Sequence, residues 1–291
     1  MNRLRSTNSS LQEIVRDSFI TEINALKPGN VSRYADGHGM TASDFLLSAD
    51  LVTPILCDTR LSLGQRILES VKITRTQVGT NTNLGMVLLF APLVITAENI
   101  TDRSIAAMQY KLRNILSIVD KSESSLIFQA IREANPGGIG HSKKFDIYTN
   151  PDCTLLEAMA VASERDTIAR QYTSGFHDVF STGLTVIKDF TVRWNRVEWA
   201  AVACYLTFLS AMPDAHIVRK YGFDIAEQVI NKATEITERF KKNDNPENAV
   251  EALLEFDRDL KGRNINPGTS ADITAASILV YKLVDSDYRE L

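Results

Sequence analysis

The sequence predicts an all-α protein that folds as a single compact multi-helix domain over residues 1–291. Apolar residues recur at intervals of three and four along almost the whole chain, which is the pattern of amphipathic helices. No segment alternates apolar and polar residues as a half-buried strand does, and no strand leads into a glycine-rich turn. The most polar connections, 137–152 and 241–248, are too short to mark a domain boundary. We therefore expect one all-helical domain.

Residues at the helix ends predict where the first two helices lie. Residues 11–26 carry an apolar stripe, so we expect a helix there with Ser9 or Ser10 as its cap. The Lys-Pro-Gly that follows ends this helix, because proline disfavours helical geometry in the residue before it. Thr41 and Asp44 have the spacing of a capping box ahead of apolar residues, which predicts the start of the second helix.

The same spacing predicts nine further helices. They are expected at 62–78, 84–97, 101–119, 123–134, 154–180, 194–212, 223–242, 247–260 and 271–286. Helices that are apolar on most of their faces need neighbours on every side. We expect the centre of the domain to consist of the three segments with that composition, near 84–97, 199–212 and 271–284.

Composition and charge exclude several classes of protein. The formal charge of -4 provides no broad basic face for nucleic acid. The longest apolar stretch, 84–95, is shorter than the roughly 20 residues that cross a bilayer, and the polar N-terminus lacks the apolar stretch of a signal peptide. The three cysteines lie too far apart for a zinc or disulfide framework. We expect a cytoplasmic protein with neither nucleic acid nor membrane as a partner.

Polar residues gather in turns that adjoin apolar helices. These turns are 27–30, 79–83, 135–138 and 266–270. The first N–H groups of a helix lack intrahelical partners and bind phosphate readily, and Gly85 and Gly268 would let a ligand approach the backbone. Helix capping is the stronger explanation for each turn taken alone, since asparagine and threonine are common caps and Thr269 and Asp272 have capping-box spacing. Each turn alone is therefore either a ligand site or a cap.

Two charged groups have the same ambiguity. Asp166 and Arg170 lie one helical turn apart, which predicts either a solvated ion pair worth about 0.3–0.5 kcal/mol or a substrate or metal site. Asp214 precedes Arg219 and Lys220 around a helix start. Arginine and lysine suit a polyphosphate, although a surface loop has the same composition.

Familiar catalytic motifs are absent from the sequence. It contains no GxxxxGK[ST], GxGxxG, HExxH or GxSxG. The four histidines are spread along the chain, and we interpret each as a polar surface or capping residue. They are His38, His141, His177 and His216.

In their order along the chain, the turns are more informative than any one of them. The segments ALKPGNVSRY, DFLLSA, VGTNTNLG, PDAHIVRKYG and INPGTSADITAASI resemble the triphosphoribosyl-dephospho-coenzyme A synthase family. The resemblance implies an all-α fold and the Mg²⁺-dependent transfer of the triphosphoribosyl group of ATP to the 2′-hydroxyl of dephospho-coenzyme A, with release of adenine. KPGNV and NTNLG replace the more usual KPGLVD and NTHKG, as in a divergent branch. Two alternatives stay open. The protein could use a pterin-linked sugar as the acceptor in the same reaction, or it could bind nucleotide without catalysing the reaction.

Together with this resemblance, the turns predict a nucleotide site. Its expected catalytic residues are Asp272, Asp166 and Asn83. The residues expected to hold nucleotide or phosphate are Lys27, Gly29, Asn30, Ser48, Asn81, Thr82, Gly85, Arg165, Arg170, Arg219, Lys220, Asn266, Gly268 and Ser270. Magnesium would be held by Asp272 and Asp214. The expected ligands are ATP and a small-molecule acceptor, and a homodimer is a further expectation.

Overall fold

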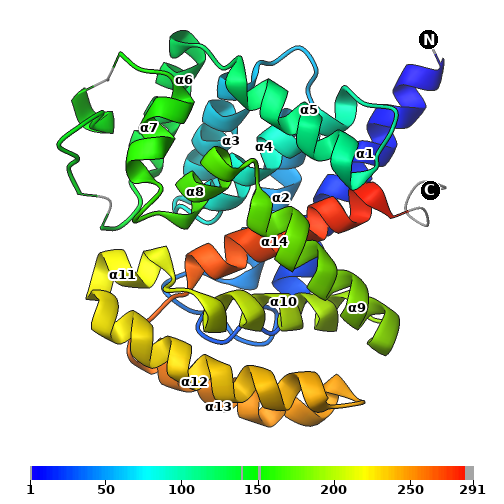
Figure 1. The fold of residues 1–291 in the computed structure, drawn as a ribbon, viewed down its shortest axis with the longest axis vertical. Coiled ribbons are helices and arrows are strands. Elements are labelled where there is room, and N and C mark those ends of the chain that lie inside the picture. Colours follow the sequence, from blue (N-terminus) through cyan, green and yellow to red (C-terminus); the bar gives the residue numbers. More distant parts are fainter. Residues whose placement is uncertain (1, 139, 150–151, 286–291) are drawn as a thin grey trace.

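The regular elements of the protein are helices throughout the part of the chain that the structure describes. The computed structural model describes residues 2–138, 140–149 and 152–285. Two isolated β-bridges, Ser32 to Ala35 and Gly37 to Met40, are the extended pairings found there. The helices pack into one compact body (Figure 1), so the predicted all-α fold is confirmed.

The described residues form α-helices of 7 to 23 residues joined by short turns. In chain order they are α1 (Asn2–Asn24), α2 (Ala42–Leu56), α3 (Leu63–Val78), α4 (Leu84–Glu98), α5 (Ile105–Ser117), α6 (Lys121–Ala134), α7 (Leu155–Ala162), α8 (Thr167–Ser174), α9 (Leu184–Trp194), α10 (Val197–Ala211), α11 (Ala215–Tyr221), α12 (Phe223–Lys242), α13 (Val250–Gly262) and α14 (Gly268–Val284). Three shorter elements are η1 (Ile147–Thr149), η2 (Val179–Gly183) and η3 (Pro246–Ala249).

The three apolar helices form the centre of the fold, as the sequence predicts. Most side chains of α4, α10 and α14 are buried. Helix α14 packs against α1, α4, α9 and α10. In Figure 1 it lies between a group that contains α3 to α8 and a group that contains α10 to α13. The first turn of α14 therefore lies where the two groups face each other.

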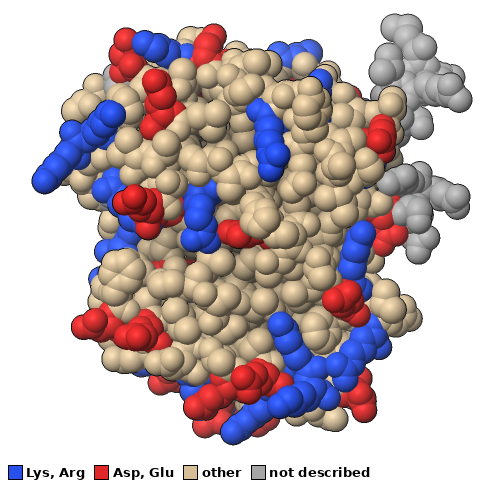
Figure 2. Space-filling view, in the orientation of Figure 1, with Lys and Arg blue, Asp and Glu red and all other residues tan. Residues whose placement is uncertain are grey.

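On the face shown in Figure 2, basic and acidic side chains are interspersed, and uncharged residues cover most of its middle. Within the described residues no single helix has the length and composition of a membrane span. Helices α10 and α11 have them only as a pair bent by 47°.

One predicted helix is divided, and this division helps to form the site. The segment 154–180 was expected to be continuous but contains α7, α8 and the start of η2. Asp166 adopts extended backbone geometry and caps α8 by accepting hydrogen bonds from the N–H groups of Ile168 and Ala169. Gly175, at φ 66°, ends α8 in the left-handed conformation. The expectation of one helix was wrong because apolar spacing continues across these two breaks.

Other helix boundaries also differ from expectation. Helix α1 begins at Asn2, so Ser9 and Ser10 lie inside it and do not cap it. Helix α14 begins at Gly268, which places Thr269 in its first turn and excludes the expected capping box with Asp272. The capping box of Thr41 is confirmed.

Candidate active site

A cavity of about 520 Å³ lies between the two groups of helices. Its walls come from α4, α6, α7, α8, α11 and α14, together with the turn at 79–83 and residues within 135–138 and 140–147. Most of the predicted site residues line it. They are Asn30, Asn81, Thr82, Asn83, Gly85, Arg165, Asp166, Arg219, Asn266, Gly268 and Asp272. The fold thus brings together turns that are distant in sequence.

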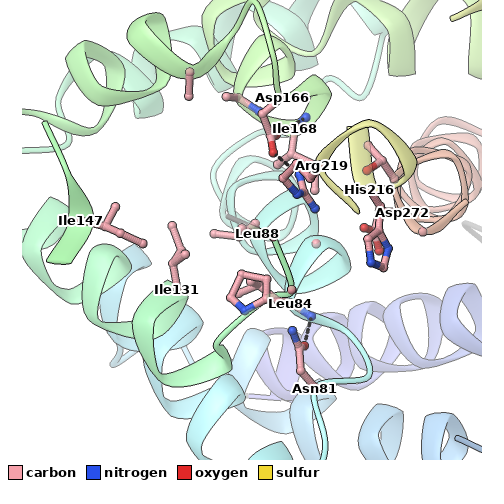
Figure 3. A pocket seen from close by; sticks show the side chains of 18 of the residues that line it. Asn81, Leu84, Leu88, Ile131, Ile147, Asp166, Ile168, His216, Arg219 and Asp272 are labelled. Atoms are coloured by element: carbon pink, nitrogen blue, oxygen red, sulfur yellow. Dashed lines mark hydrogen bonds and ion pairs between the residues drawn. The ribbon is translucent and has the colours of Figure 1, made fainter. Parts of the chain in front are cut away.

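The cavity has an apolar end and a polar end. Figure 3 shows Ile131 and Ile147 on one side, separated by Leu88 from a group of polar side chains. The labelled polar residues opposite them are Asp166, Arg219, His216 and Asp272. A ligand with a flat apolar part and an anionic part would match this division.

An ion pair joins two helices at the polar end. One carboxylate oxygen of Asp166 caps α8, and the other accepts a hydrogen bond from Arg219 of α11 at 2.6 Å. The expected neighbour, Arg170, instead pairs with Asp178 at 3.0 Å and does not line the cavity. The helical spacing misled here because Asp166 stands outside the helix as its cap. Asp166 therefore holds a guanidinium at the cavity wall.

Asp272 lies in the first turns of α14, against α4. A Cβ on Gly85 would overlap its carboxylate, so the absence of a side chain at position 85 makes room for it. Burial raises the pKa of Asp272 well above its usual range, and the nearby carboxylates of Glu22 and Asp214 raise it further. Within the described part of the chain, no residue forms a hydrogen bond or ion pair with this carboxyl group, which leaves it available to a ligand.

His216 is a site residue that the sequence interpretation missed, because it was taken as a surface or capping histidine. It lines the polar end from α11, and a Cβ on Gly268 would lie 2.7 Å from its Nδ1 atom. Burial lowers the pKa of the imidazole to about 4, with a further contribution from Arg219. Its position three residues before Arg219 in a short helix was the available signal, since that spacing places both on one face.

Several buried polar atoms at the cavity lack a partner within the described part of the chain. They are Asn30 Oδ1, Thr82 Oγ1 and Arg219 Nε. Buried polar atoms in folded proteins are almost always hydrogen-bonded to protein, water or ligand. Three residues that line the same cavity therefore carry hydrogen-bonding capacity that no described protein atom satisfies.

The asparagines of the turn at 79–83 also support its shape. Asn81 accepts a hydrogen bond from the N–H of Leu84 at 3.1 Å and so caps α4 in place of Asn83. Asn83 donates to the hydroxyl of Ser48, which also contacts Thr74. Ser48 is buried behind the turn and does not line the cavity, so its predicted contact with nucleotide is replaced by a role in holding Asn83.

Lys27 does not bind phosphate in this arrangement. Its side chain is fully buried, and its Nζ atom donates to the carbonyl oxygens of Glu22 and Val31 at 2.8 and 2.9 Å. It also lies 3.1 Å from the carboxylate of Glu22. The adjacent Gly29 donates its N–H to Asp257 and likewise lies outside the cavity. Both residues hold the turn instead of contacting the cavity.

The remaining charged candidates are also displaced from the cavity. Lys220 is exposed, with its Nζ atom 5.7 Å from the centre of the Tyr221 ring. Asp214 is buried and accepts from the N–H groups of His216 and Ile217 and from the N–H and hydroxyl of Ser270. These bonds occupy both carboxylate oxygens of Asp214. Its predicted role as a metal ligand, and that of Ser270 in binding nucleotide, are therefore corrected to structural roles between α11 and α14.

Of the two carboxylates predicted to hold magnesium, Asp272 lines the cavity and Asp214 does not. Within the described residues there is no group of three or more histidine, cysteine, aspartate or glutamate side chains that could hold a metal ion. Magnesium commonly binds through one or two carboxylates plus substrate phosphates, so it does not require such a group. Asp272 fits this mode, because it lines the cavity and the neighbouring carboxylates create an excess of negative charge around it.

Comparisons with known proteins identify the family and a similar fold. A family model described as "CitG: ATP:dephospho-CoA triphosphoribosyl transferase" matches residues 8–290. The crystal structure of a provisionally named triphosphoribosyl-dephospho-coA synthase from Archaeoglobus fulgidus is similar, with a TM-score of 0.64 and 26% sequence identity. The similarity covers 82% of this chain and 98% of that one. A search of curated proteins found no match.

Proposed function

Because the chain belongs to the ATP:dephospho-CoA triphosphoribosyl transferase family, we propose that it transfers the triphosphoribosyl group of ATP to the 2′-hydroxyl of dephospho-coenzyme A and releases adenine. The observation that carries the proposal is the cavity with an apolar end, a guanidinium and unpartnered buried polar atoms. ATP has the matching parts in one molecule, which are a flat base, a ribose and a triphosphate.

The division of the cavity supports one orientation of ATP. The base would lie at the apolar end, where Leu88, Ile131 and Ile147 remove apolar surface from water. The triphosphate would lie near Arg219 and Arg165, because planar guanidinium groups bind phosphate oxygens in pairs. The ribose would then lie between the base and the triphosphate, within reach of Asp272 at the polar end.

The chemistry requires negative charge near the ribose. The bond from C1′ to the base nitrogen breaks while a bond from C1′ to the acceptor oxygen forms, and positive charge develops on the sugar. Carboxylates that are fixed in a partly dry cavity stabilise such charge without reorganising. Asp272 and Asp166 line the cavity and are suited to this role.

Magnesium fits the same site as a further part of the proposal. Asp272 would hold it together with phosphate oxygens of ATP, and its charge would neutralise the triphosphate. The raised pKa of Asp272 supports this placement, because a cation would compensate for the carboxylates that surround it.

The experiment is to incubate the purified protein with ATP, Mg²⁺ and dephospho-coenzyme A and to measure free adenine by chromatography. We expect adenine only when all three are present, in a one-to-one ratio with the coupled product. No adenine release under these conditions would contradict the proposal. Adenine release with a pterin-linked sugar but not with dephospho-coenzyme A would show that the pterin-linked sugar is the acceptor. A rise in melting temperature with ATP but no adenine from any acceptor would indicate a nucleotide-binding protein.

A further inference from the structure

We propose that His216 is a substrate-contacting residue that holds the acceptor, with its imidazole accepting a hydrogen bond from the hydroxyl group that attacks ATP. The inference rests on the proposed function and adds a subsite to it. It names the wall of the cavity from which the acceptor enters, and it assigns a role to a side chain that the ATP site does not use.

The position of the imidazole is fixed by the structure around it. Asp214 caps α11 and accepts from the backbone N–H of His216 at 2.9 Å, while the same carboxylate holds Ser270 of α14. The ring packs against Gly268 through its Nδ1 side, because a Cβ there would lie within 2.7 Å of that atom. With Nδ1 against Gly268, we assign the contact with the acceptor to Nε2.

His216 and Asp272 belong to the same part of the cavity. Gly268, which His216 contacts, lies one helical turn before Asp272, so both positions face the same side of α14. Both side chains occupy space left by a glycine, Gly268 for the imidazole and Gly85 for the carboxylate. Figure 3 shows the two at the polar end, away from Ile131 and Ile147.

The chemistry of the ring favours a hydroxyl over a phosphate. Burial, together with the positive charges of Arg219 and Lys220, favours the uncharged imidazole. An uncharged imidazole has one nitrogen that accepts a hydrogen bond, which suits a hydroxyl donor. Phosphate oxygens only accept hydrogen bonds, and Arg219 beside the ring is the better partner for them.

The geometry of displacement places the acceptor on the same side. In a single displacement the incoming oxygen approaches C1′ from the face opposite the departing base. With the base at the apolar end, the oxygen enters from the polar end, where His216 lies. The hydroxyl oxygen bonds to C1′ as the bond from C1′ to the base nitrogen breaks. The hydroxyl loses one proton and adenine gains one, so the reaction balances without another reactant.

The test compares His216→Ala and His216→Gln with the wild-type protein and with His177→Ala, an exposed histidine outside the cavity. Steady-state kinetics give KM for dephospho-coenzyme A and for ATP separately. We expect His216→Ala to raise KM for the acceptor by about tenfold or more, as the loss of one buried hydrogen bond predicts, and to leave KM for ATP within about twofold. Glutamine carries an amide near the position of Nε2 and should restore part of the loss.

A binding measurement separates this inference from the proposed reaction. Dephospho-coenzyme A is titrated calorimetrically into each protein in the absence of ATP, so the result does not depend on turnover. Weaker binding by His216→Ala alone supports the acceptor subsite even if no adenine is released. Unchanged affinity and KM for the acceptor in His216→Ala, an equal loss in His177→Ala, or no binding by the wild-type protein would each overturn the inference.

Discussion

The carboxylate of Asp272 lies against the backbone of Gly85, in space that a Cβ at position 85 would occupy. Gly85 is in the first turn of α4, so two central helices meet there without an intervening side chain. A side chain at position 85 would overlap the carboxylate of Asp272, so the glycine is needed for packing. The carboxylate of Asp272 reaches the cavity because residue 85 has no side chain.

Gly85→Ala should therefore damage catalysis more than folding. The added methyl group would push the Asp272 carboxylate aside, and a displacement of about 1 Å in an active site can cost about 100-fold in rate. We expect kcat/KM for adenine release to fall by about that factor, measured with saturating Mg²⁺. The control is Gly262→Ala, because a Cβ at Gly262 would meet nothing within 4 Å. Equal activity of the two variants would show that Asp272 is not positioned by this contact.

Asp272→Asn should abolish turnover and change how stability depends on pH. Folding raises the pKa of this carboxyl above its usual 3.8, so the folded state holds the proton more tightly. The resulting stabilisation is complete below the unfolded pKa and is lost as pH rises through the folded pKa. The melting temperature of Asp272→Asn minus that of the wild type should therefore increase from about pH 4 to about pH 8 without ligands.

Asp189→Asn is the matched control, because Asp189 is exposed on α9 and lies outside the cavity. Its melting temperature should follow that of the wild type at every pH. A constant difference between Asp272→Asn and the wild type across this range would contradict the raised pKa. Activity within tenfold of the wild type would remove Asp272 from the reaction.

The sequence predicted features that lie within a single helix, such as its apolar composition. It predicted few of the contacts between helices. All-round apolar composition identified α4, α10 and α14 as central, because such a helix has no face suited to water. The same spacing joined α7 to α8, because a break caused by one capping residue leaves the apolar pattern almost unchanged. The ordered turns located one part of the cavity wall, because the residue types that end a helix also bind ligands.

The errors in the candidate site have a common cause. Sequence shows that Lys27 is basic and next to a turn, but not that Glu22 and two carbonyl oxygens surround its ammonium group. Asp214 and Ser270 are close in sequence to residues that line the cavity, yet they bind each other. His216 was missed because its burial depends on Gly268, which is 52 positions away in the chain. Partners determined by tertiary contacts are not encoded in local spacing.

Arg219 and Lys220 should differ sharply although they are adjacent. Arg219 lines the cavity and is held by Asp166 at 2.6 Å, whereas Lys220 is exposed. Arg219→Ala should raise KM for ATP by about tenfold or more, because hydrogen bonds to charged groups contribute more than neutral ones. Arg219→Lys should raise KM for ATP less than Arg219→Ala does but should not match the wild type, since lysine lacks the planar guanidinium fork.

Lys220→Ala is the control and should change KM for ATP by less than about threefold. Adenine release at varied ATP with fixed acceptor measures both variants. If Lys220→Ala has the larger effect, the phosphates lie outside the cavity, and the orientation proposed for ATP is wrong.

Lys27 separates a structural role from phosphate binding. Lys27→Met leaves the carboxylate of Glu22 buried without its cation, and breaking a buried ion pair costs about 3–5 kcal/mol. We expect a fall of that size in the free energy of unfolding, measured with urea, while KM for ATP stays within about twofold at a temperature where the variant is folded. The double variant Lys27→Met with Glu22→Gln should recover part of the loss, because it removes the unpaired charge. A phosphate-binding Lys27 predicts the reverse, a raised KM for ATP at unchanged stability that Glu22→Gln does not relieve.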